Sequence, residues 1–196
     1  MFKETTFTIP PLKGLSSNTL EEHLKLYAGY VKHSNLILDH IAELANNGEK
    51  YAYELGELQR RFSFEFCGMR NHEYYFKGFE GGAHPLSEGG ALAKALTGTF
   101  GSIEAFLARF KAVALTRGIG WAMLYYDSAT EKLLTQWVDE QHIGQLATCN
   151  IILALDMWEH SFVADYQPSG KKQYVEDFFI NLNWNVIEKN YESVVK

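Results

Sequence analysis

The fold is decided by the stretch Ile151-Ile152-Leu153-Ala154-Leu155-Asp156-Met157-Trp158-Glu159-His160. Its first five residues are all apolar, which predicts a buried β-strand. Asp156 is then expected where the strand leaves the core, with His160 on the turn that follows. Burying a carboxylate at such a place is costly unless it is paired or binds a metal ion. The alternative is that Asp156 caps a following helix while a backbone carbonyl satisfies His160.

Histidine supplies the other candidate metal ligands. A mononuclear site for a redox metal needs three or four ligands, usually His and carboxylate, from separate elements. The chain has seven histidines, at positions 23, 33, 40, 72, 84, 142 and 160. Apart from His160, two of them lie in segments suggestive of such a site: His23 within Thr19–Val31 and His72 within Arg70–Phe76.

The pattern Asp156-x-Trp158-Glu159-His160 after an apolar strand resembles the signature of the iron/manganese superoxide dismutases. Further similar segments follow the family's order along nearly the whole chain, namely Leu15–Val31, Asn71-His72-x-x-Tyr75-Phe76, Phe100-Gly101-Ser102 with Phe106, Gly118-Ile119-Gly120-Trp121, and Asn183-Trp184. Single pieces are weak signals, but chance does not produce their combination in this order.

The resemblance implies a metal site and an activity. The family's ligand set carries over residue by residue as His23, His72, Asp156 and His160, and it implies one iron or manganese ion per chain. Three imidazoles and one carboxylate suit either metal. The implied reaction is the disproportionation of superoxide, a small anion, to dioxygen and hydrogen peroxide. It requires a metal that alternates between adjacent oxidation states and a supply of protons to the peroxide.

The first helix departs from the family near the site. Many members carry His four and Tyr eight residues after the first ligand, where this chain has Tyr27 and Val31. A helix turns by about 100° per residue, so Tyr27 and Tyr30 share a face with His23. We expect Tyr30 to be the gateway phenol and Tyr27 to replace the second His. Alternatively, both tyrosines are ordinary core residues of an amphipathic helix.

The residue that tunes the metal also departs from the family. Typical iron members carry Gln four residues before the second ligand, where this chain has Gly68. Typical manganese members carry Gln in the loop before the Asp ligand, and here that loop, Asp139–Gly144, contains Gln141 and His142. We expect His142 to be the tuning hydrogen-bond donor, as in members with His in this loop, and Gln141 to be the second choice. His142 could instead be an exposed loop residue, and the choice between iron and manganese stays open.

Aromatic and acidic side chains complete the expected site. Trp121 and Trp158 are expected to pack around the metal and exclude water, which strengthens local electrostatics. In the family, the residue at Glu159 meets a ligand His of the partner subunit, which implies a homodimer or a dimer of dimers. The family's Tyr three residues after the last ligand is Val163 here, so one hydrogen bond across that interface is in doubt.

Composition limits the alternatives. The 196 residues are enough for one or two small domains, and 46% hydrophobic and 14% aromatic residues argue against disorder. No apolar stretch of about 18 residues is present, so no membrane span is expected. A net charge of −6 without a basic cluster disfavours nucleic-acid binding. Lys25 and the pair Lys171-Lys172 could attract an anionic substrate locally, or be ordinary surface lysines.

The chain is expected to be cytoplasmic. Its first residues, Met1–Phe7, lack the basic start and apolar run of a signal peptide. Its two cysteines, Cys67 and Cys149, form no disulfide framework and are expected to be small buried hydrophobes.

Local patterns predict an α+β fold, with an N-terminal α-helical hairpin followed by a C-terminal α/β domain that contains a small antiparallel sheet. One or two long helices are expected over 15–44 and another over roughly 50–80, with a break at Asn46-Asn47-Gly48. Further helices are expected at about 87–97, at about 102–117 and after about 170, and strands at 120–127, 132–138 and 150–155. The turn-rich segment Phe79–Pro85 is expected to separate two domains, residues 1–82 and 83–196.

Three other protein classes compete with the dismutase hypothesis. A helical di-iron carboxylate protein needs Glu-x-x-His pairs, and none of the candidate ligands has Glu three positions before it. A zinc hydrolase would share the ligand types, but the chain has no His-Glu-x-x-His. The remaining rival is a metal-stabilised dimer that has kept the fold and lost fast turnover, which Tyr27, Val31 and Val163 motivate. The intact ligand set favours the active enzyme.

Overall fold

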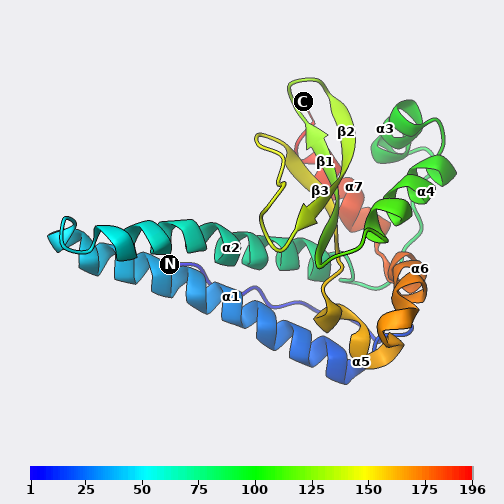
Figure 1. Ribbon diagram of the computed structural model, residues 1–196. Helices are drawn as coiled ribbons and strands as arrows, with labels where there is room; N and C mark the ends of the chain where they lie inside the picture. The colour runs from blue at the N-terminus through cyan, green and yellow to red at the C-terminus, as the bar shows by residue number, and fades with distance from the viewer. Residues whose placement is uncertain (196) are drawn as a thin grey trace.

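The computed structural model describes residues 1–195. Its first part is a long antiparallel hairpin of two helices, α1 (Ser17–Leu44) and α2 (Ala52–Lys77), which projects from the rest of the molecule (Figure 1). A 3-10 turn, Ala45–Asn47, lies between them, at the break that the sequence predicts. Helix α1 begins after Ser16, whose hydroxyl accepts a hydrogen bond from the Thr19 amide at 3.2 Å. This bond satisfies one of the free amides of the first turn.

The hairpin helices bury one face each, and the N-terminal arm lies along them. Residues three or four positions apart form the buried stripe of α1, which consists of Thr19, His23, Tyr27, Val31, Ser34 and Ile37. The arm is held because Asn35 bonds both the amide and the carbonyl of Phe2, at 2.7 and 2.9 Å. Phe7 packs farther along the arm against Tyr27 and Phe76.

The second part contains a three-stranded antiparallel sheet in the order β2-β1-β3. Its strands are β1 (Gly120–Asp127), β2 (Lys132–Asp139) and β3 (Asn150–Asp156). The Asp127 carboxylate closes the first hairpin by accepting hydrogen bonds from Ala129 N and Thr130 Oγ1. Between β1 and β3, Trp121 lies opposite Asp156. Because β3 also contacts α2, the end of the sheet that carries Asp156 is brought to the hairpin.

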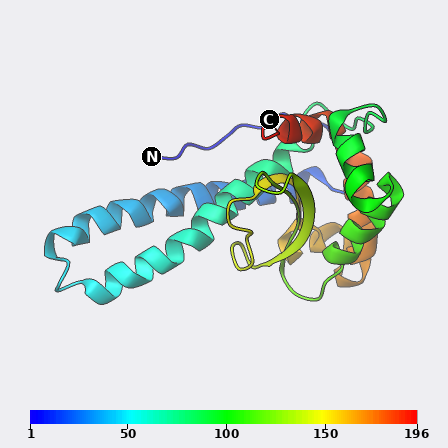
Figure 2. The same cartoon turned by 90° about the horizontal axis from the view of Figure 1, so that it is seen from above.

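The remaining α-helices of residues 1–195 are α3 (Ala91–Phe100), α4 (Ile103–Ala114), α5 (Val163–Tyr166), α6 (Lys171–Asn181) and α7 (Trp184–Glu192). Helix α4 packs on β1 and β2, and α7 packs on β3. Figure 2 shows α4 and α6 side by side at the end of the molecule away from the hairpin tip, where Lys111 and Glu176 form an ion pair at 2.5 Å. The predicted α+β fold with a small antiparallel sheet is confirmed. The short α5 was not predicted, because four residues are too few to show a helical period.

Among residues 1–195, every helix is too short or too polar to cross a membrane.

Candidate metal centre

Four side chains from separate elements meet where the hairpin touches the end of the sheet. His23 comes from α1, His72 from α2, Asp156 from the last position of β3, and His160 from the turn after it. One potential ligand atom from each lies within 4.8 Å of the others. The Nε2 atoms of His23, His72 and His160 lie 3.1, 3.4 and 3.2 Å from the same oxygen, Asp156 Oδ2. The structure therefore brings together the four residues that were predicted as ligands from the sequence.

Backbone and hydroxyl groups fix the orientation of Asp156. Its other carboxylate oxygen, Oδ1, accepts a hydrogen bond from the Trp158 amide at 2.8 Å. Its backbone carbonyl accepts from Tyr174 Oη at 2.9 Å and from Ser161 Oγ at 3.1 Å. The 3-10 turn after β3 then brings His160 to the same carboxylate. Oδ1 of Asp156 is thus hydrogen-bonded to the backbone, and Oδ2 faces the three imidazoles.

The hydrogen bonds of His72 indicate that the cluster fits a cation. Its Nδ1 lies 2.6 Å from the Gly68 carbonyl, which can only accept, so Nδ1 carries the proton and Nε2 carries a lone pair. That Nε2 is buried without a hydrogen-bond partner and faces the Asp156 carboxylate 3.4 Å away. Two electron-rich atoms at this distance repel each other unless a cation lies between them. Three imidazoles and a carboxylate are also a donor set that suits iron or manganese.

Burial of His23 and His72, and the interactions of Asp156 with its neighbours, keep these three side chains in the protonation states that bind a metal. Burial lowers the pKa of His72 to about 3, and burial also lowers the pKa of His23. Burial by itself raises the pKa of Asp156, but its interactions with His160 and His23 hold that pKa below its ordinary value. Neutral imidazoles beside an ionised carboxylate are the forms that coordinate metal ions.

Aromatic rings enclose the cluster. The ring of the fully buried Trp121 lies 5.0 Å from that of His72, and the rings of Tyr75 and Phe76 lie 5.1 and 4.8 Å from that of His23. Trp158 stacks on His160 with ring centroids 5.9 Å apart. The His160 side chain is 22% exposed, while those of the other three candidate ligands are 2% exposed or less. The site is therefore open to solvent on the side of His160.

Gln141 connects the rim of the cluster to Trp121. Its side-chain amide donates to Tyr30 Oη at 2.9 Å, and its side-chain carbonyl accepts from the Trp121 indole nitrogen at 2.8 Å. Because an indole N–H can only donate, the orientation of the Gln141 amide is determined. The Tyr30 hydroxyl hydrogen is then free to point elsewhere, and the Tyr30 ring lies 5.1 Å from that of His72.

The structure places Gln141, rather than the first-choice His142, beside Tyr30. The His142 ring packs edge-on to Phe64 with centroids 5.7 Å apart, and its Nδ1 is buried without a hydrogen-bond partner. The turn that carries both residues is tight, with a φ of 50° at Glu140. Neighbouring side chains on such a turn point in different directions, and only one of these two reaches Tyr30.

Gly68 makes room for the Tyr30 ring. A Cβ atom at this position would come within 2.6 Å of Tyr30 Cδ1. The Tyr30 ring thus occupies the space that opens at Gly68, and it packs there against the helix that carries His72.

Tyr27 lies away from the Tyr30 and Gln141 hydrogen bond. Its hydroxyl accepts from the Thr5 amide at 2.9 Å and donates to Glu73 Oε1 at 3.2 Å. Glu73 in turn pairs with Arg70 at 2.7 Å. These contacts do not support the interpretation of Tyr27 as a replacement for the family's second His. They tie the N-terminal arm to the hairpin instead.

Sequence reasoning missed the residues that hold Gln141 and Asp156 in place. Asn71 Nδ2 donates to the backbone carbonyl of Gln141 at 2.9 Å, and Gln145 Nε2 donates to Asn71 Oδ1 at 3.1 Å. Asn71 directly precedes a candidate ligand, so its position was a usable signal. Gln145 and Tyr174 carry no comparable signal, because only the folded chain brings them to the site.

Comparison with known proteins agrees with this geometry. Residues 88–190 match the family described as iron/manganese superoxide dismutases, C-terminal domain. A protein of Mycobacterium intracellulare named as a manganese superoxide dismutase is 35% identical over 172 residues, which are 86% of this chain and 80% of that protein. The chain belongs to the iron/manganese superoxide dismutase family.

Other relatives in the family differ in the metal that their names give. A protein of Aeropyrum pernix named for manganese or iron is 31% identical over 203 residues, 96% of this chain and 92% of its own length. A protein of Pyrobaculum aerophilum named as an iron superoxide dismutase is 28% identical over 204 residues, 96% of this chain and 93% of its own. The buried His and Asp cluster fits the iron or manganese ion after which this family is named.

Proposed function

We propose that this chain is a superoxide dismutase that converts superoxide to dioxygen and hydrogen peroxide at one iron or manganese ion per chain. The observation that carries the proposal is the convergence of three imidazole Nε2 atoms, at 3.1 to 3.4 Å, on one oxygen of Asp156. Membership of the family supports the reaction. The small, ring-lined surroundings of the cluster suit a diatomic substrate.

Different residues of the protein would hold the ion and transfer protons. His23, His72, Asp156 and His160 would hold the ion, which supplies electron transfer by alternating between two oxidation states. Burial raises the pKa of Tyr30, with further contributions from the charges of Asp156 and Glu65, so its hydroxyl keeps its proton at neutral pH. Tyr30 can therefore give a proton at that oxygen toward the product and take one back from the adjoining solvent.

We propose manganese as the better of the two metals for this chain. Manganese members supply Gln from the loop before the Asp ligand, and Gln141 lies in that loop with its amide on Tyr30. Iron members supply Gln from the position of Gly68, where the Tyr30 ring leaves no space for a side chain.

Reconstitution of metal-free protein with iron and with manganese, in separate samples, tests these proposals. Each sample is assayed for metal content and for superoxide dismutation. We expect one ion per chain in both and higher activity with manganese. Tight binding of both metals without activity would contradict the proposed function and would favour the metal-stabilised protein without turnover.

We also propose that the chain forms a homodimer, or a dimer of such dimers, with Glu159 at the interface. Glu159 is exposed and adjacent to His160, and the family pattern sets this carboxylate against a ligand His of the partner subunit. A carboxylate that accepts from a ligand His orients its ring and raises its basicity. Val163 lacks the hydroxyl that the family's Tyr offers across the interface, so Glu159 carries more of the contact.

Glu159→Gln is expected to weaken the dimer, because an ionised acceptor at the interface becomes a neutral one. We expect its dissociation constant to rise about tenfold, which corresponds to about 1.4 kcal/mol. Sedimentation over a concentration series measures it, with Glu104→Gln on the exposed side of α4 as the control. A wild-type protein that is monomeric at every concentration would overturn the proposal.

Tyr30→Phe is expected to keep the metal and lower the activity about tenfold, less than the 10²–10⁴-fold typical of a general acid because water can partly replace the phenol. The loss should grow as the pH rises, since Tyr30 stays protonated in the wild type while protons in solution become scarcer. The measurement is the pH profile of the rate, with Tyr74→Phe as the control. An unchanged profile would mean that Tyr30 is only a core residue.

The ion is also proposed to link the two predicted domains, residues 1–82 and 83–196, since two of its ligands would come from each. We further propose that the protein is cytoplasmic. The unpaired cysteines, Cys67 and Cys149, favour this location.

A further inference from the structure

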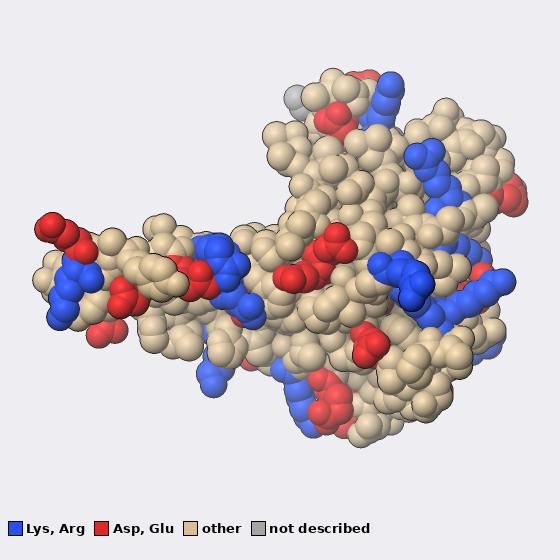
Figure 3. Space-filling model, viewed as in Figure 1, with Lys and Arg blue, Asp and Glu red and all other residues tan. Residues whose placement is uncertain are grey.

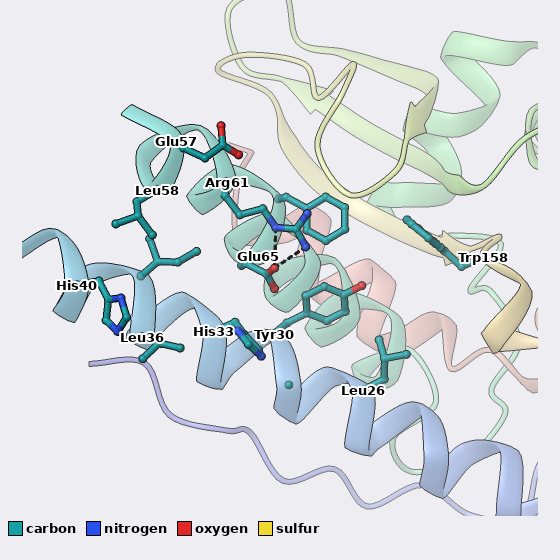
Figure 4. A pocket seen from close by; sticks show the side chains of 13 residues that line it. Leu26, Tyr30, His33, Leu36, His40, Glu57, Leu58, Arg61, Glu65 and Trp158 are labelled. Carbon is teal, nitrogen blue, oxygen red and sulfur yellow. Dashed lines mark hydrogen bonds and ion pairs between the residues drawn. The ribbon is translucent and has the colours of Figure 1, made fainter. Parts of the chain in front are cut away.

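A cavity of about 760 Å³ opens beside the candidate metal centre. It lies between α1 and α2, and its lining includes Tyr30 and Trp158, which both border the cluster. Figure 4 shows these two side chains toward one end, with His33 and His40 farther out along α1. The walls are mostly apolar. An anion that reaches the exposed side of the centre can do so through this cavity.

Arg61 lies in this cavity and is held from two sides. Its Nε and Nη2 atoms donate to the same carboxylate oxygen of Glu65, at 2.9 and 2.7 Å, as the dashed lines in Figure 4 show. Its guanidinium carbon lies 3.9 Å from the centroid of the Phe64 ring, which is a cation–π contact. The Arg61 side chain is 47% exposed, whereas that of Glu65 is 9% exposed. The position of the charge is thus fixed while the charge itself stays open to the cavity.

Phe64 connects Arg61 to the mouth of the site. Its ring centroid lies 6.1 Å from that of Tyr30 and 6.4 Å from that of Trp158. The guanidinium therefore rests on a ring that lies next to both residues bordering the cluster. An anion attracted by Arg61 is brought to the rim of the site and not merely to the surface of the hairpin.

Two of the three lysines that were candidates for attracting the substrate are engaged elsewhere. Lys25 is exposed and pairs with Glu22 at 2.6 Å, and Lys171 donates to the Thr116 carbonyl at 2.8 Å. Arg61 is the single Lys or Arg among the described residues that line the cavity. On the face shown in Figure 3, basic and acidic side chains are interspersed along the hairpin, and the net charge of the chain is −6. The chain as a whole therefore does not attract anions, and a local cation at the cavity can do so.

We propose that Arg61 guides superoxide through this cavity toward the metal centre. The inference rests on the proposed function, because superoxide is the substrate that the function implies. A fixed charge between apolar walls acts on an anion more strongly than the same charge on an open surface, because less water screens it. Glu65 uses only part of the guanidinium, which keeps N–H donors free to contact a passing anion. Glu65 also offsets the charge, so the anion is not retained.

The experiment compares Arg61→Gln with Arg60→Gln in the metal-loaded, full-length protein. Arg60 is the matched control, because it precedes Arg61 on α2, carries the same charge and does not itself line the cavity, although its partner Glu57, at 2.5 Å, does. The second-order rate with superoxide is measured at low and at high ionic strength. The affinity for azide, a small anion that needs no turnover, is measured by absorbance titration.

For Arg61→Gln we expect a rate about three- to tenfold lower at low ionic strength, at or below the lower end of the roughly 10- to 10³-fold range of electrostatic steering because only one charge is removed. We expect azide binding to weaken to a similar extent. The difference should disappear at high salt, where exposed charges are screened. Arg60→Gln should change either quantity less than about twofold, and Arg61→Lys should recover most of the loss because it restores the charge. Metal content and thermal stability identify any variant that misfolds.

The failure of this inference differs from the failure of the proposed function. If the wild type dismutates superoxide and both glutamine variants match its rate and its azide affinity, Arg61 does not guide the substrate. Equal losses in both variants would likewise overturn the proposal, because they would show an effect of net charge only. A wild type without activity would instead overturn the proposed function, and the azide titration would still test the role of Arg61.

Discussion

Asp156→Asn is expected to abolish metal binding and dismutase activity together. The substitution keeps the size and leaves the Trp158 amide an oxygen to bond, but it removes the negative charge on which the three histidines converge. Three neutral imidazoles alone hold a divalent or trivalent ion much more weakly than the same imidazoles with a carboxylate. We expect metal content to fall below about a tenth of an ion per chain and activity to fall about 100-fold or more, beyond the 10–100-fold typical for groups that only support a ligand. Metal analysis and activity after manganese reconstitution measure both effects.

Asp177→Asn is the matched control for this substitution. Asp177 is also a buried acid, 4% exposed, and it pairs with Lys13 at 2.9 Å and accepts from Tyr166 Oη at 3.1 Å. Its replacement should lower the free energy of unfolding by about 1–3 kcal/mol through the weakened buried contacts while metal content stays at the wild-type level. Full metal content in Asp156→Asn would contradict the ligand assignment.

The main features of the fold were predictable because each depends on a local signal. The apolar run before Asp156 predicts a buried strand, and β3 ends at that residue. The break at Asn46-Asn47-Gly48 separates two helices that each run for more than six turns. The four candidate ligands were identified through short motifs, and two of them, Asp156 and His160, are only four positions apart. Their meeting with His23 and His72 then follows from the order in which the family's motifs occur along the chain.

The side chains around the ligands were harder to predict because their directions depend on distant contacts. Helical spacing correctly sets Tyr27 on the face of His23, but it cannot show that the N-terminal arm supplies Thr5 as a partner for the Tyr27 hydroxyl. Gln141 and His142 are adjacent in sequence, so no periodicity separates them. The turn at Glu140, with its positive φ, decides which of the two points at Tyr30.

Gln141→Leu is expected to keep the metal and lower the activity about 10- to 100-fold, the range typical for groups that orient a metal site from outside its ligands. Leucine has a similar size but removes the donor to Tyr30 and the acceptor for the Trp121 indole N–H. Leaving that buried N–H unsatisfied should also cost about 1–3 kcal/mol of stability. The measurements are the activity per bound manganese and the midpoint of unfolding.

His142→Leu separates the two neighbouring residues experimentally. Its ring packs on Phe64 and makes no hydrogen bond with Tyr30 or Gln141 in the described part of the chain, so leucine at this position should preserve the contact and keep activity within about twofold. If His142→Leu lowered the activity per bound metal more than Gln141→Leu does, His142 would be the tuning residue, as the loop pattern alone suggests. The reverse result would mean that Tyr30 needs the amide of Gln141 because that amide occupies the phenol oxygen and leaves the hydroxyl proton available to the product.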